Sequence, residues 1–131
     1  MDPAANDSLL RRLLEAFATD DVGATEAVFD DDVTWHEPGT NRFSGQFRGR
    51  TAMMQRLMQM RQAGLSSRFE VHDVVANEDH AVALVHLRLE VADGRRYEQP
   101  QVQVAHARDG RIVEFWTMNQ DQAVLDLLIG A

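Results

Sequence analysis

The sequence contains no cysteine and no lysine. Without cysteine the chain can form no disulfide, no cysteine nucleophile and no thiolate-bound metal site. All 13 basic residues are arginine, and 21 acidic residues outnumber them, which gives a formal net charge of -8. An acidic surface with scattered arginines repels a phosphate backbone, so we expect no nucleic-acid partner.

Long apolar runs are also missing. No stretch approaches the ~20 apolar residues that span a bilayer, and no basic amphipathic helix is available to bind a membrane surface. Residues 1–7 are acidic and polar, unlike a secretory signal peptide. We therefore expect a cytoplasmic protein with no membrane partner.

The remaining composition is ordinary for a globular domain: of 131 residues, 44% are hydrophobic and 26% are charged. We expect a single domain over residues 1–131, with residues 1–5 frayed. Apolar residues at helical spacing predict helices, and alternating segments bounded by Asn, Asp and Gly predict strands. The expected helices cover 8–18, 22–29 and 50–63, with 120–131 a C-terminal tail or short helix, and the expected strands cover 33–37, 67–76, 80–92, 95–107 and 111–119.

Short turns join the last four of these strands, and strands joined in this way pair antiparallel. The chain is therefore expected to be an α+β domain. Its N-terminal helices would pack against a curved antiparallel sheet and enclose a pocket for a small molecule.

Glutamines alternate along the strand expected at 95–107. If each Asp-Gly turn is a three-residue loop, Leu87 faces Gln99, Gln103 faces Phe115, and all odd-numbered residues of these strands point inward. An unpaired buried amide costs roughly 1–3 kcal/mol, so a ligand or pocket water is expected to bind these amides. A two-residue turn at Asp109-Gly110 favours the alternative, in which Val102 and Val104 face the core and the glutamines face solvent.

If the glutamines face inward, the outer face of the sheet is too apolar to face water. It would carry Val102, Val104, Ile112, Trp116 and Met118. An apolar face of this kind predicts a homodimer formed through the outer sheet face.

Three segments carry a family resemblance: residues 27–39, 47–50 and 108–116. With the order of elements, they resemble the nuclear-transport-factor-two-like superfamily, and most of all its SnoaL-like branch of polyketide cyclases and ketosteroid isomerase relatives. The resemblance covers about residues 8–121. It implies a cystatin-like or ketosteroid-isomerase-like roll, in which helices and sheet form a cone-shaped pocket.

The resemblance also implies site residues. Ketosteroid isomerases place a carboxylate base just before the proline that ends the first strand, where Glu37 stands before Pro38 here. Their tyrosine and aspartic acid oxyanion donors correspond to Leu13 and Gln103, and the aspartate of the cyclases corresponds to Thr117. A glutamate in an apolar pocket has a raised pKa and can move a proton next to a carbonyl. Alternatively, Glu37 is a loop-end carboxylate held by backbone N–H groups.

From these residues and this resemblance we predict a cofactor-independent isomerase, cyclase or dehydratase acting on a small apolar carbonyl or polyketide-like compound. Glu37 would be the base and Gln103 would hold the oxyanion. We expect no metal, because the histidines lack ligand spacing. The alternatives are a non-catalytic ligand-binding protein and a dimeric accessory module. The residues expected to bind the ligand are Trp35, Met53, Leu57, Tyr97, Gln99, Gln101, Phe115, Thr117 and Asn119.

Overall fold

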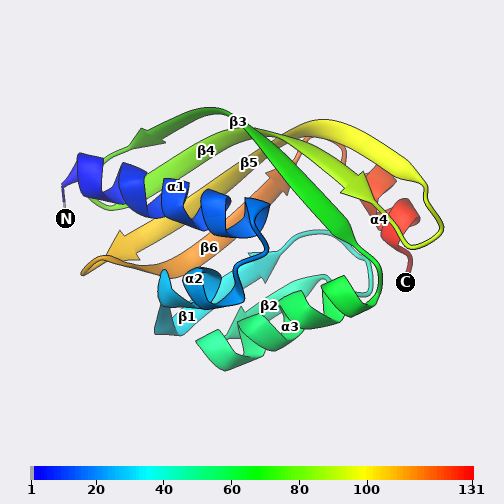
Figure 1. The fold of residues 1–131 in the computed structure, drawn as a ribbon, viewed down its shortest axis with the longest axis horizontal. Helices are drawn as coiled ribbons and strands as arrows, with labels where there is room; N and C mark the ends of the chain where they lie inside the picture. The colour runs from blue at the N-terminus through cyan, green and yellow to red at the C-terminus, as the bar shows by residue number, and fades with distance from the viewer. Residues whose placement is uncertain (1) are drawn as a thin grey trace.

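The computed structural model describes residues 2–131, which form four helices and one six-stranded sheet (Figure 1). Along the sheet the strands follow the order β2-β1-β6-β5-β4-β3. The elements in chain order are α1 (Pro3–Ala18), α2 (Val22–Ala27), β1 (Phe29–Glu37), β2 (Gly45–Arg48), α3 (Arg50–Gln62), β3 (Ser66–Ala76), β4 (His80–Glu90), β5 (Arg96–Arg108), β6 (Arg111–Asn119) and α4 (Gln122–Ile129).

Helix α1 begins earlier than its apolar pattern suggests. Asp2 is the N-cap, its carboxylate accepts the N–H of Ala5 at 2.7 Å, and Pro3 stands in the first turn, where proline is tolerated. Pro3, Ala4 and Ala5 are therefore helical, although we expected residues 1–5 to fray; Met1 lies outside the described residues. The apolar stripe of α1 is buried against β3 and β4 and consists of Leu9, Leu10, Leu13 and Leu14.

The α+β class and the curved sheet are confirmed, with one departure from the antiparallel pattern. Strands β3 to β6 form an antiparallel meander, but β1 pairs with β6 in parallel. Strand β2 pairs antiparallel with β1 and lies between residues 37 and 50, where no strand was expected. The sheet is open, since β2 and β3 form its two edges.

The turn between β5 and β6 decides which side chains face inward. Asp109 and Gly110 have φ values of 53° and 79° and form a two-residue turn that pairs Arg108 with Arg111. Such a turn alone would bring Trp116 to the inner face. A β-bulge at Val113 adds one residue, so that Phe115 points inward opposite Ala105.

Two expectations change as a result. Gln103 pairs with Thr117 instead of Phe115, although Thr117 and Phe115 both lie on the inner face as expected. Ile112 precedes the bulge, pairs with Ala107 and is fully buried, so its expected place on the outer face is wrong. The pairing of Leu87 with Gln99 is confirmed, and so is the buried, inward-facing row of glutamines.

Helices cover the inner face of the sheet in separate places. Helix α1 lies over β3 and β4, whereas α3 lies beside β1 and β2 (Figure 1). The segment at 120–131 contains α4, which is capped by Asp121 and buries Leu125 against Leu87 and Leu89. No helix within residues 2–131 has both the length and the apolarity needed to cross a membrane.

Candidate functional site

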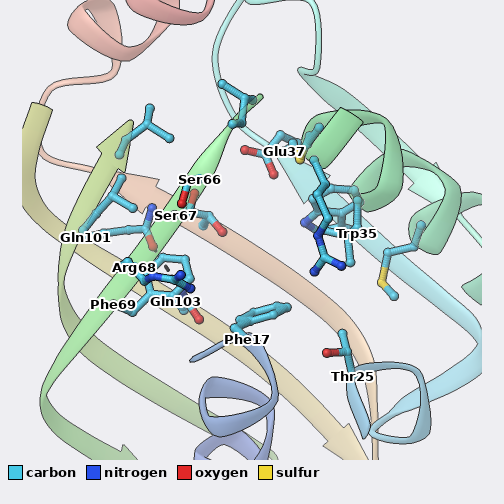
Figure 2. Close-up of a pocket in the computed structure, with 18 of the residues that line it drawn as sticks. Phe17, Thr25, Trp35, Glu37, Ser66, Ser67, Arg68, Phe69, Gln101 and Gln103 are labelled. Carbon is cyan, nitrogen blue, oxygen red and sulfur yellow. Dashed lines mark hydrogen bonds between the residues drawn. The ribbon is translucent and has the colours of Figure 1, made fainter. Parts of the chain in front are cut away.

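A cavity of about 430 Å³ lies between the helices and the inner face of the sheet. This volume suits a drug-sized ligand. Figure 2 shows Trp35 and Glu37 on one side, Gln101 and Gln103 on the other, and Phe17 between them. Helix α3 adds a soft wall of Met53, Met54, Leu57, Met58 and Met60. The flexible thioethers adapt to irregular apolar ligands.

Most of the predicted site residues meet in this cavity. Its lining includes Trp35, Glu37, Met53, Leu57, Gln101, Gln103, Phe115, Thr117 and Asn119. Tyr97 and Gln99 do not line it. Tyr97 packs beside the cluster of Leu125, while Gln99 accepts the Asp121 N–H at 2.6 Å and donates to the Asp121 carbonyl at 3.1 Å. The expected ligand contact of Gln99 is thus replaced by a structural link that fixes the start of α4.

Glu37 stands at the end of β1, immediately before Pro38, and faces the cavity. Its side chain is surrounded by protein but keeps some surface accessible from the cavity. Within residues 2–131 its carboxyl group has neither an ionic partner nor a hydrogen-bond donor, so the backbone N–H groups considered above do not hold it. Burial raises the pKa of Glu37 from 4.5 to about 8. At pH 7 only about one molecule in ten would carry the ionised form.

A chain of side-chain amides runs along the opposite wall. We call it the amide row: Gln103, Gln101, Asn119 and Gln122. Gln103 Nε2 donates to Gln101 Oε1 at 3.0 Å, and Gln101 Nε2 donates to Asn119 Oδ1 at 2.8 Å. Asn119 Nδ2 then donates to Gln122 Oε1 at 2.8 Å. At its outer end, Gln122 Nε2 donates to Asp126 Oδ1 at 3.0 Å.

The inner end of the amide row is incomplete. The side chain of Gln103 is 2% exposed, and its Oε1 has no hydrogen-bond partner within residues 2–131. One N–H of Gln103 donates to Gln101, and Oε1 is the atom at this end without a partner. An oxyanion would be repelled by this free acceptor, although Gln103 retains a second N–H. Trp35 and Thr117 also line the cavity, and neither the indole N–H nor the hydroxyl group has a partner in the same residues.

Three charged residues at the cavity edge were not predicted from the sequence. Arg61 from α3 and Arg68 from β3 approach Asp20, with N–O distances of 3.3 and 3.8 Å. All three line the cavity, and their side chains are between 50% and 59% exposed. Asp20 lies 41 positions before Arg61, and Arg68 lies 7 positions after Arg61, so no local sequence pattern could have predicted that they meet. Phe17, in contrast, continues the inner stripe of α1 and was detectable.

Residues that could bind a metal ion do not cluster within residues 2–131. No group of three or more His, Asp or Glu side chains gathers within the described part of the chain, residues 2–131. His36 points away from the cavity, contacts Glu114 at 2.6 Å and stacks on Trp116 at a centroid distance of 5.2 Å. It is therefore part of the outer face.

Solved structures share the fold along its whole length. A protein of unknown function with a cystatin-like fold from Xanthomonas campestris has a TM-score of 0.89 and 24% identity, and 100% of both chains is covered. A candidate polyketide cyclase from Xanthomonas campestris pv. campestris has a TM-score of 0.84 and 19% identity, covering 99% of this chain and 100% of that one. TerC, co-crystallised with polyporic acid, has a TM-score of 0.84 and 17% identity, covering 97% and 99%.

At these identities the likeness shows the fold alone, and a comparison with curated proteins finds no match. The sequence itself matches a family model. The model described as the SnoaL-like domain aligns with residues 10–115, which is most of the chain. This chain belongs to the SnoaL-like family.

Proposed function

We propose that this protein is a cofactor-independent acid–base enzyme acting on a small apolar carbonyl compound, as an isomerase, cyclase or dehydratase. The observation that carries the proposal is Glu37: a carboxyl group with a pKa raised to about 8, facing a largely apolar cavity of about 430 Å³. A group that titrates near neutral pH can both accept and return a proton.

The reaction step follows from this placement. The ionised carboxylate of Glu37 takes a proton from the carbon beside the carbonyl, and the electron pair of that C–H bond moves to the carbonyl oxygen to give an enolate. The carboxylic acid then returns the proton, to the same carbon or to a conjugated one. The donors available to the enolate oxygen are the indole N–H of Trp35 and the hydroxyl group of Thr117.

Deuterium exchange tests this step without knowledge of the natural substrate. The probe is 2-tetralone, an apolar bicyclic ketone with acidic α-protons, followed by proton NMR in D₂O. We expect the protein to accelerate exchange over buffer, and Glu37→Gln to lower the rate by about 10²- to 10⁴-fold while calorimetric affinity stays within a few-fold. Glu114→Gln, on the outer face, is the matched control and should exchange like the wild type.

The opposite results are equally clear. Exchange that is unchanged in Glu37→Gln would remove Glu37 as the base. Binding of 2-tetralone with exchange no faster than in buffer would favour the alternative, a ligand-binding protein without catalysis. The structure of TerC, solved with polyporic acid, supports small-molecule binding by this fold in general.

We also propose a homodimer through the outer face of the sheet. Apolar side chains gather there and several are exposed, including Met118 at 53%, Val75 at 52% and Leu84 at 37%. Sedimentation velocity at micromolar concentration should give a dimer for the wild type and a monomer for Met118→Glu. Leu127→Glu, an exposed leucine on α4, is the control that should stay dimeric. A monomeric wild type would contradict the proposal.

A further inference from the structure

The direction of the amide row is fixed at its outer end by Asp126. An ionised carboxylate accepts hydrogen bonds and cannot donate them. Burial acts to raise the pKa of Asp126, but hydrogen bonds from Gln122, Asn41 and Thr40 outweigh it and hold the pKa below its usual value. Asp126 Oδ1 accepts from Gln122 Nε2 at 3.0 Å and from Asn41 Nδ2 at 2.8 Å. The carbonyl of Pro38, at 3.4 Å, is a second acceptor for Gln122.

This direction passes from one amide to the next. Reversing Gln122 would place its carbonyl oxygen against the carboxylate of Asp126, so its Oε1 must face Asn119. Asn119 must then turn its oxygen toward Gln101, and Gln101 must turn its oxygen toward Gln103. Reversing Gln103 alone would bring two carbonyl oxygens together. The unpaired acceptor at the inner end therefore cannot be removed by flipping one amide.

We propose that Gln103 Oε1 is a specificity site for a hydroxyl group, so that the ligand is an apolar carbonyl compound that also carries a phenolic, enolic or alcoholic hydroxyl. The inference rests on the proposed function, because it assigns a substrate class to the same cavity. Oε1 is enclosed by the wall of the cavity that Gln103 lines, so a ligand hydroxyl that enters the wall there meets an acceptor without a partner. A buried acceptor without a donor is costly, so a hydroxyl that reaches it is favoured.

Glu37 complements this requirement from the other side of the cavity (Figure 2). Glu37 acts on the carbon beside the ligand carbonyl, whereas Gln103 Oε1 offers an acceptor that has no partner within residues 2–131. The two walls therefore differ in polarity: one side accepts a ligand hydroxyl, and the other holds the reacting carbonyl. A purely hydrocarbon ketone would satisfy only the Glu37 side.

Calorimetry with a matched pair of probes tests the inference. The probes are 2-naphthol and 2-methoxynaphthalene, which share a skeleton and differ in the hydroxyl proton. We expect the wild type to bind 2-naphthol about tenfold or more tightly than the ether. Gln103→Met, which keeps the length of the side chain but has no carbonyl oxygen, should bind the two probes within about twofold of each other.

A remote variant keeps the test independent of the cavity wall. In Asp126→Asn the residue at the outer end can donate as well as accept, so the amide row can reverse and the preference for 2-naphthol should fall several-fold. Asp93→Asn, an exposed aspartate that binds Arg95 in the β4–β5 turn, is the matched control and should keep the preference.

Each outcome separates this inference from the proposed function. Equal affinities for the two probes in the wild type, or binding of neither, would overturn the inference even if 2-tetralone exchange depends on Glu37. Neither probe needs proton transfer, so Glu37→Gln should keep the preference for 2-naphthol. A preserved preference together with absent exchange would leave the ligand class standing and remove the catalysis.

Discussion

The neutral state of Glu37 has a direct consequence for stability. A carboxyl group whose pKa is higher in the folded than in the unfolded state stabilises the fold while it is protonated in both. With a pKa of 4.5 when unfolded and about 8 when folded, the stabilisation is complete below about pH 4.5 and is lost as the pH rises toward 8. The linkage relation gives a loss of about 4 kcal/mol between about pH 5 and about pH 9 as an upper bound, because water in the cavity solvates the carboxylate.

Urea denaturation at constant ionic strength measures this loss. The free energy of unfolding is determined at a series of pH values for the wild type and for Glu37→Gln, which cannot ionise. Other titrating groups are common to both proteins and cancel in the difference. We expect the wild type to lose stability relative to the variant above about pH 5, with roughly 1 kcal/mol or more of the loss falling between about pH 7 and about pH 9. Parallel curves would refute a raised pKa.

Three further predictions concern the framework of the cavity. Deleting Val113 removes the extra residue of the bulge but leaves His106 opposite Glu114 and Ala105 opposite Phe115, so the protein should keep a cooperative thermal unfolding transition; loss of that transition would contradict this register. Gln99→Leu should cost about 1–3 kcal/mol in urea denaturation, because both backbone groups of Asp121 lose their partner, and a loss below measurement error would contradict the link. Ile112→Ala should cost about 2–5 kcal/mol, and an effect typical of a surface site would contradict its burial.

Strand alternation made much of the inner face predictable. Inward-facing residues recur at every second position of β4 and β5, and a short Asp-Gly turn connects the two strands. The register that pairs Leu87 with Gln99 could therefore be worked out from local rules. The carboxylate before Pro38 was also detectable from its position. These features depend only on neighbours in sequence or on one turn.

The register of β5 with β6 shows where such reasoning fails. We predicted a three-residue loop without a bulge, whereas the structure has a two-residue turn and a bulge at Val113. Each difference reverses the face of the following residues, so together they restore the predicted face for Phe115. Arg111 and Ile112, between the turn and the bulge, change sides.

Long-range contacts account for the rest. Gln99 was expected at the ligand because its strand neighbours are, but α4 returns over this end of the sheet and Asp121 occupies both of its polar atoms. The polarity of Gln103 depends on Asp126, 23 positions further along the chain, through three intervening amides. No pattern in β5 alone could reveal that its free end is an acceptor.

The most direct test of the account is the titration of Glu37 itself. Carbon-13 NMR of the glutamate side-chain carboxyl carbons, with Glu37→Gln used for assignment, gives the pKa of this one group. We predict a midpoint near pH 8, because the carboxyl group faces an apolar cavity without an ionic partner. A midpoint near the ordinary value of 4.5 would show that Glu37 is well solvated, and proton transfer by this residue near neutral pH would lose its physical basis.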